Sequence, residues 1–284
     1  MGILLNLLYV LGEAIAGLIT HSLALLTDAG HNLSDVASLG LSLLAFRLAR
    51  LKPSQHFTYG YKKSTILAAL VNAIILLVAI GILGYEAALR LTHPQSLQGG
   101  VVAWVAALGI VVNGVSAMLF FRNKHELNAK SAYLHLLADA LVSVGVVIAG
   151  IVIVYTKWYW LDAVVSLGVL VVILFSTWSL LSDSVRLSLD AVPQNVDIEA
   201  VEKGMNAVAG VKQVSHIHIW AMSTTENALT AHLEADASLS FVEKLKVVKV
   251  LKHELEHHNI QHATIELDDT APATDASCHL AGTK

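Results

Sequence analysis

The sequence predicts an α-helical membrane domain with six transmembrane helices, followed by a small α+β domain with the element order αββαβ. Of the 284 residues, 55% are hydrophobic and only 14% are charged, whereas an ordinary soluble domain carries about 25% charged residues. Six long apolar runs precede Asp190, and short alternating segments follow it. We therefore expect two domains, at residues 1–190 and 191–284.

A helix needs roughly 20 mostly apolar residues to cross a bilayer, and all of the six runs except the first reach this length. The runs cover residues 3–19, 22–46, 64–91, 101–121, 131–156 and 161–182. The first is the shortest, but it lacks the basic leading segment of a signal peptide and its apolar part is too long for one. We expect all six runs to span the membrane.

Lysine and arginine residues between the runs predict the orientation of the chain. Eight lie in the loops after the second and fourth runs: Arg47, Arg50, Lys52, Lys62, Lys63, Arg122, Lys124 and Lys130. The opposite loops hold only Arg90 and Lys157. Positive charge marks cytoplasmic loops, so we expect both termini in the cytoplasm.

One four-residue spacing occurs twice inside the apolar runs, as His31 with Asp35 and as His135 with Asp139. A charged residue at the bilayer centre costs about 2.5–3.5 kcal/mol, so it indicates function by default. Residues i and i+4 share one helix face, so two such helices would present two imidazoles and two carboxylates. That ligand set suits tetrahedral Zn²⁺. Two buried His–Asp hydrogen bonds joining helices are the alternative, but the identical spacing favours a metal.

The part after Asp190 contains eight of the 14 histidines and shows periods typical of short elements. Apolar residues at helical spacing predict helices near 198–208 and 239–255. Alternation predicts strands at 214–220, 229–234 and 262–268, with both helices on the apolar side of the sheet. The uncovered side would then carry His216, His218, His232, His262, Glu266 and Asp268. Such a face is a metal site, a dimer interface, or both.

Several of these segments together resemble the cation diffusion facilitator family. Residues 22–31 read SLALLTDAGH and, with Asp35, are similar to that family's second transmembrane segment. Residues 57–62 (FTYGYK), and residues 132–135 (AYLH) with Asp139, are similar to its third and fifth segments. Residues 218–220 (HIW) and 231–233 (AHL) are similar to its cytoplasmic domain.

The resemblance covers nearly the whole chain and implies a homodimeric transporter, not an enzyme, in the bacterial inner (plasma) membrane. It implies six helices in contact with membrane lipid, a ferredoxin-like cytoplasmic domain, and efflux of divalent metal by alternating access, coupled to inward proton flow. The paired His–Asp motifs then indicate Zn²⁺ as the transported ion, with Cd²⁺ or Co²⁺ as further candidates. No nucleic-acid partner is expected.

The resemblance also implies a regulatory metal site on the cytoplasmic sheet. Its ligands here would be His232, Asp268, Glu266 and His216. Many relatives carry a histidine where this chain has Ser215, so we expect a weaker or rearranged site.

Two other functions use the same residues. A haem protein would use His31 and His135 as axial ligands, although the two aspartates argue against it. A membrane metallohydrolase would need an open coordination position and a separate general base, and no such base lies near the motifs. Among the remaining carboxylates, Asp28 lies one turn from His31. It is either part of an exit path for the metal or a capped, hydrated residue near the outer end of its helix. Glu13 has no visible partner in the sequence.

Overall fold

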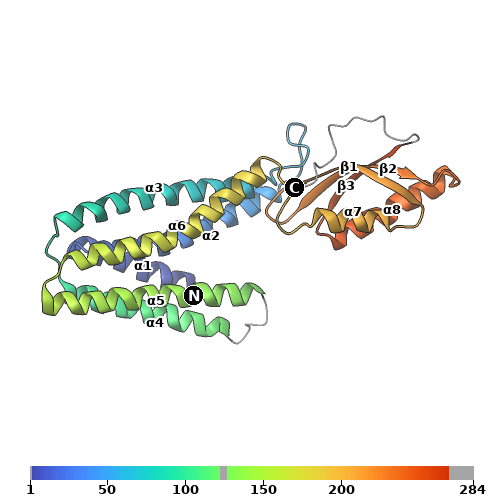
Figure 1. The fold of residues 1–284 in the computed structure, drawn as a ribbon. Helices are drawn as coiled ribbons and strands as arrows, with labels where there is room; N and C mark the ends of the chain where they lie inside the picture. Colours follow the sequence, from blue (N-terminus) through green and yellow to red (C-terminus); the bar gives the residue numbers. More distant parts are fainter. Residues whose placement is uncertain (1, 122–126, 269–284) are drawn as a thin grey trace. The chain divides into compact units, whose positions relative to one another are not determined.

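The computed structural model describes residues 2–121 and 127–268, and this part of the chain contains eight helices and three strands (Figure 1). The long helices are α1 (Gly2–Thr20), α2 (Leu23–Ala49), α3 (Ser64–Thr92), α4 (Gly99–Phe121), α5 (Leu127–Thr156) and α6 (Trp160–Ser188). The following elements are α7 (Ile198–Asn206), β1 (Val211–Ala221), β2 (Asn227–Ala235), α8 (Phe241–His257) and β3 (His262–Asp268). The predicted order αββαβ is confirmed.

Within the described residues, the four helices α3, α4, α5 and α6 are long and apolar enough to cross a membrane. The apolar stretch of α1 covers Leu7–Thr20 and is shorter. Helix α2 has the length, but Asp28, His31 and Asn32 lower its hydropathy. Large apolar side chains such as those of Trp104 and Tyr155 are about four-fifths exposed (80% and 83%). The chain is therefore a multi-pass membrane protein.

The chain divides into two compact units, residues 1–41 with 71–181, and residues 42–70 with the chain from 182 onward. Helices α2, α3 and α6 contribute to both units. The predicted domain boundary at residues 190 and 191 stays a prediction.

In the first unit, α4 and α5 run side by side (Figure 1). A side chain at Gly99 would collide with the carbonyl oxygen of Gly150, and one at Gly150 would collide with that of Gly99. Small residues let membrane helices approach closely and gain van der Waals contact. The glycine pair thus fixes how α4 lies against α5, the helix that carries Asp139.

The second unit joins the loop between α2 and α3 to the α+β domain. Lys62 forms an ion pair with Glu226 in the turn between β1 and β2, and Lys63 Nζ lies 2.7 Å from Asp190 Oδ1. The Tyr59 ring meets the His262 ring edge-on, with centroids 5.4 Å apart. Ion pairs near the surface contribute little stability each. These contacts therefore determine the orientation of the loop but add little to the free energy of folding.

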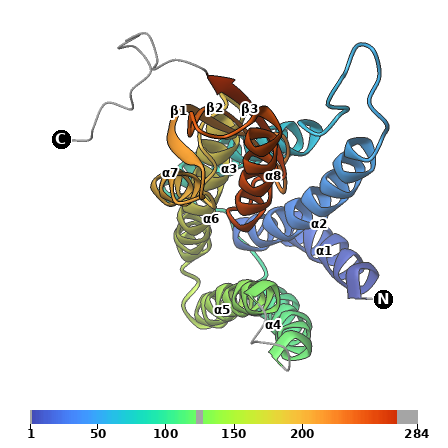
Figure 2. The same cartoon turned by 90° about the vertical axis from the view of Figure 1, so that its right-hand side faces the viewer.

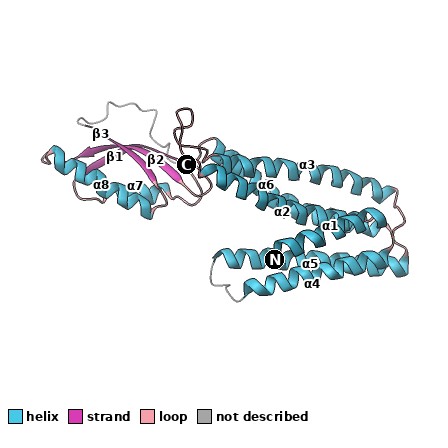
Figure 3. Ribbon diagram, turned by 180° about the vertical axis from the view of Figure 1, so that it is seen from behind, coloured by secondary structure: helices cyan, strands magenta, loops and turns pink. Residues whose placement is uncertain are grey.

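The α+β domain is a three-stranded sheet with both helices on one face. Strand β2 is central, antiparallel to β1 and parallel to β3. The parallel connection runs through α8, as a crossover between parallel strands requires. Helices α7 and α8 lie on the same side of the strands (Figures 2 and 3), so that in the described part of the chain no helix covers the other face, as predicted.

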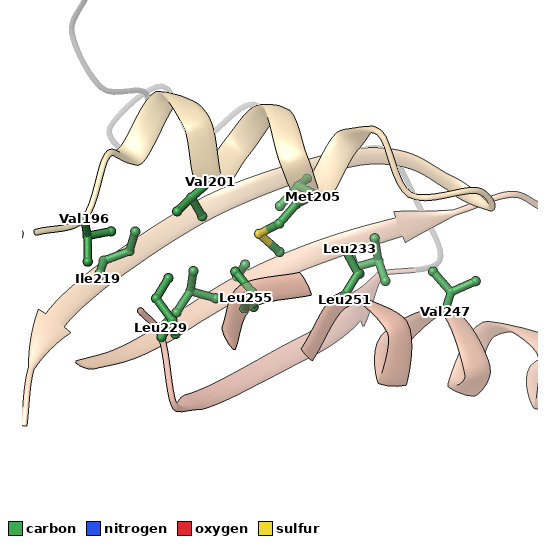
Figure 4. Close-up of a cluster of buried hydrophobic side chains, with 12 residues drawn as sticks. Val196, Val201, Met205, Ile219, Leu229, Leu233, Val247, Leu251 and Leu255 are labelled. Atoms are coloured by element: carbon green, nitrogen blue, oxygen red, sulfur yellow. The ribbon is translucent and has the colours of Figure 1, made fainter. Parts of the chain in front are cut away.

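Apolar side chains from both helices and the sheet form the core of this domain (Figure 4). Met205 of α7 and Leu251 and Leu255 of α8 are fully buried against Leu229 and Leu233 of β2. The intervening residues Thr230, His232 and Glu234 are only half-buried. The strand therefore turns its apolar side to the helices and its polar side away from them.

Polar residues fix where the two helices begin. The side chain of Asp197 accepts hydrogen bonds from the amides of Glu199 and Ala200 at the start of α7. At the start of α8, Ser240 and Glu243 form a reciprocal capping box. The hydrogen bonds from Ser240 lower the pKa of the Glu243 carboxyl below its ordinary value, so this cap is retained until the pH falls well below neutrality.

Replacing Leu251 with alanine should destabilise the α+β domain by about 2–5 kcal/mol, because it removes buried contacts and leaves a cavity. Hydrogen exchange on the full-length protein should show faster exchange across α7, α8 and the strands. Val250→Ala is the matched control, since Val250 is its neighbour on α8 but 54% exposed. Equal exchange in the two variants would contradict the assignment of Leu251 to the core.

Candidate metal centre

The structure brings together one residue from each His–Asp motif. His31 on α2 and Asp139 on α5 lie with Nε2 and Oδ1 3.6 Å apart. This separation is an ion-pair contact and too long for a hydrogen bond. The Asp139 residue is buried, at 5% exposure. Two potential metal ligands that are far apart in sequence thus lie close together between two helices of the first unit.

The other two predicted ligands lie on the same helices, but their side chains are outside the described part of the structure. Asp35 follows His31 by one turn of α2, and His135 precedes Asp139 by one turn of α5. Among the described residues, no three His, Cys, Asp or Glu side chains converge as a metal site. The tetrahedral quartet therefore stays a prediction, supported by the contact between His31 and Asp139.

A hydrogen-bonded clasp positions the start of α2, the helix that carries His31. Asp162, near the start of α6, accepts hydrogen bonds from Ser22 Oγ at 2.5 Å and from the backbone amide of Leu23 at 2.6 Å. A third, longer bond comes from the amide of Ala24. The first amides of a helix lack intrahelical partners, so a buried carboxylate at this position caps α2 from another helix. Nothing in the spacing of the sequence indicates this role.

A second pair of buried carboxyl groups lies close to His31 and Asp139. Asp28 on α2 is fully buried and accepts a hydrogen bond from Ser143 on α5. Glu13 on α1 is 1% exposed and interacts with Asp28. The expectation that Glu13 has no partner is therefore wrong. Its partners lie on other helices or one turn away, where reading along the sequence does not find them.

On the uncovered face of the sheet, His232 lies between two carboxylates of β3. Its Nδ1 is 2.9 Å from Asp268 Oδ2, and its Nε2 is 3.8 Å from Glu266 Oε2. In the parallel register, His232 pairs with Glu266, so these side chains share one face. His262 is on the same strand face, beside Tyr59. The alternation predicted for β2 and β3 is confirmed.

The alternation predicted for β1 is wrong at its centre. Ser215 pairs with His232 and His218 pairs with Thr230, so β1 has one residue more than β2 between these positions. The extra residue makes a β-bulge, and His216 there adopts a positive φ of 50°. The His216 ring lies 4.9 Å from the His232 ring. Bulges re-aim side chains, and this one brings Ser215, His216 and His218 toward the uncovered face together.

Two family models match the chain. The model described as the cation efflux transmembrane domain matches residues 1–187. The model described as the cytoplasmic domain of cation efflux proteins matches residues 193–270.

Curated relatives match almost the full chain. The "Cadmium, cobalt and zinc/H(+)-K(+) antiporter" of Bacillus subtilis is 36% identical, over 93% of this chain and 86% of that protein. The "Metal cation efflux system protein CzcD" of Cupriavidus metallidurans is 37% identical, over 97% of this chain and 90% of that protein. The "Zinc transporter ZitB" of Escherichia coli is 35% identical, over 96% and 87%.

Replacing Asp162 with alanine should loosen the start of α2, because it leaves two buried backbone amides without an acceptor. We expect a loss of about 1–3 kcal/mol for these groups and faster hydrogen exchange at Leu23 and Ala24. Asp183→Ala is the control, since Asp183 lies on the same helix as Asp162 but accepts its hydrogen bond from Gln194. Unchanged exchange at both amides in Asp162→Ala would contradict the clasp.

Proposed function

The chain belongs to the cation efflux family, and we propose that it exports Zn²⁺ from the cytoplasm in exchange for protons. The family assignment makes it a metal-cation transporter and not an enzyme. The proposal rests chiefly on the contact between His31 and Asp139 inside the helix bundle. The relatives named for zinc, cadmium and cobalt support this range of substrates.

The donor set favours zinc as the principal substrate. Two imidazoles and two carboxylates, from His31, Asp35, His135 and Asp139, form a tetrahedral site of mixed nitrogen and oxygen donors. Two ionised carboxylates also neutralise a divalent cation, so the occupied site has a net charge near zero and is tolerated among apolar helices. Cd²⁺ and Co²⁺ accept similar donors, and selectivity among these metals depends on fine geometry.

Proton exchange follows from the same ligands. Metal binding requires deprotonated ligands and releases protons, and histidine is the side chain that titrates near neutral pH. Protons that reach His31 from the outside therefore weaken the site and help the metal to leave. The protonated empty site then returns to face the cytoplasm, which gives alternating access between two states.

We propose that all six helices α1–α6 cross the bacterial inner membrane, with lipid around them and both termini in the cytoplasm. The excess of lysine and arginine in two loops supports this orientation. The domains would cover residues 1–190 and 191–284. The second would be a ferredoxin-like domain that joins two chains as a homodimer.

A second, regulatory zinc site would lie on the uncovered sheet face. His232, Asp268 and Glu266 already lie within 4 Å of one another through His232, and the bulge brings His216 beside them. Each ring nitrogen of His232 lies near a different carboxylate, so these side chains would have to rearrange to bind one cation together. Bound metal would stabilise the state that holds these ligands together.

Replacing Asp139 with alanine should abolish zinc transport, because it removes a ligand and leaves the bound cation under-neutralised. Zinc uptake into proteoliposomes should fall by about 10²-fold or more, with the helices still folded by circular dichroism. Asp183→Ala removes an exposed carboxylate of α6 that bonds Gln194 and should transport normally. Zinc flux at the wild-type rate in Asp139→Ala would refute the transport site.

Replacing His232 with alanine should remove the cytoplasmic zinc without removing the transported one. Equilibrium dialysis of the full-length protein should show about one fewer zinc bound per chain, with the weaker class of site lost. His253→Ala is the control, because His253 on α8 is an exposed histidine with a neighbouring carboxylate, Glu256. Equal zinc binding in wild type and His232→Ala would leave the sheet face without a metal role.

A further inference from the structure

Two buried carboxyl groups, Glu13 on α1 and Asp28 on α2, form a pair beside the proposed transport site. Their residues are 1% and 0% exposed. One oxygen of each carboxyl accepts a hydrogen bond from a hydroxyl group. The Tyr9 hydroxyl donates to Glu13 Oε1 at 2.8 Å, and the Ser143 hydroxyl donates to Asp28 Oδ2 at 3.1 Å. The pair is therefore held by hydroxyls from α1 and α5.

The other two oxygens of the pair are Glu13 Oε2 and Asp28 Oδ1, which are buried and receive no hydrogen bond from any donor among the described residues. The two carboxyl groups are close enough to act on each other electrostatically. A proton on one of them would replace this repulsion with a hydrogen bond between the two carboxyls. Two like charges in contact away from water also cannot both persist. The geometry therefore calls for one proton shared by two carboxyls.

The charged and titratable groups around the pair do not replace that proton. Tyr9 faces it from α1, His31 acts on it from α2 and Asp139 from α5. From α4, Gly109 lies against the hydroxyls of Tyr9 and Ser143, and a larger residue there would displace them. Asn32 approaches Glu13, and its own amide nitrogen is buried without a partner. None of these side chains is a lysine or arginine.

The pair lies one helical turn from the transport site on both helices that carry it. Asp28 precedes His31 by three residues on α2, and Ser143 follows Asp139 by four residues on α5. Both offsets run toward the α2 end that is capped by Asp162. In the proposed orientation this end faces the outside, so the pair lies between the metal and the exit.

We propose that Glu13 and Asp28 form a proton-binding site that holds one shared proton and exchanges it as the metal binds and leaves. The inference rests on the proposed zinc–proton exchange, and it adds a second group, besides the metal ligands, that binds the exchanged proton. When Zn²⁺ binds between His31 and Asp139, its charge favours departure of the shared proton. Return of a proton to the pair favours departure of the metal, because such coupling is reciprocal.

Infrared difference spectroscopy on the full-length protein tests the pair without any transport. Wild type near neutral pH should show the carbonyl stretch of a protonated carboxyl, and this band should decrease when Zn²⁺ is added. The band should be absent in Glu13→Gln and in Asp28→Asn. Glu86→Gln, which removes a carboxylate paired with Arg90 on α3, should retain it. A band that persists in both pair variants overturns the proposal.

Zinc titrations at several pH values supply the second readout. The slope of log Kd against pH, which counts protons released per zinc, should fall by about one in each pair variant and stay at the wild-type value in Glu86→Gln. An unchanged slope overturns the proposal. Loss of zinc binding at every pH, as expected for Asp139→Ala, overturns it too, because the carboxyls would then be metal ligands. If wild type binds no zinc but shows the band, the proposed function fails while the shared proton remains.

Discussion

The cost of burying ionised carboxylates among apolar helices is the constraint on which the membrane domain depends. An isolated buried charge is strongly unfavourable, so it is paired, protonated or bound to a metal. Asp139, Asp28, Glu13 and Asp162 are each at most 5% exposed, and each meets this constraint differently. Asp162 accepts backbone amides, Asp139 faces His31, and Glu13 and Asp28 face each other.

These partners divide the buried carboxylates into those with a structural role and those that exchange a metal ion or a proton. Asp162 accepts three hydrogen bonds from the chain itself, so its oxygens have fixed donors and it can hold the start of α2 in place. Asp28 and Glu13 each have one buried oxygen that receives no hydrogen bond among the described residues, and a cation or proton would complete it, while Asp139 faces His31. The close contact of α4 and α5 at Gly99 and Gly150 supports this exchange, because it keeps α5 in a fixed position against its neighbour.

The sequence predicted those features that depend on residue spacing. Hydropathy indicated the long helices, alternation indicated β2 and β3, and the His-x-x-x-Asp spacing indicated which turns of α2 and α5 meet. Hydropathy was a weaker guide for α2, because the residues that carry the chemistry also lower its apolar character.

Features that depend on contacts between distant segments were not predictable in this way. The β-bulge at Ser215–His218 adds one residue to β1, and strict alternation has no means of anticipating it. The partners of Glu13 and Asp162 lie on other helices or, for Tyr9, one turn away, and they become visible only when the helices are packed. The bulge nevertheless lies beside the histidines of the uncovered face, where local irregularity re-aims side chains.

If buried charges in this bundle exchange a metal ion for protons, the two ions cross the membrane in opposite directions. The most direct test uses sealed proteoliposomes that contain a trapped pH indicator, with the membrane potential clamped by valinomycin and equal potassium. A zinc gradient imposed across the membrane should drive protons in the direction opposite to zinc, and reversing the zinc gradient should reverse them. Zinc movement without proton movement, or with protons moving in the same direction, would rule out metal–proton exchange.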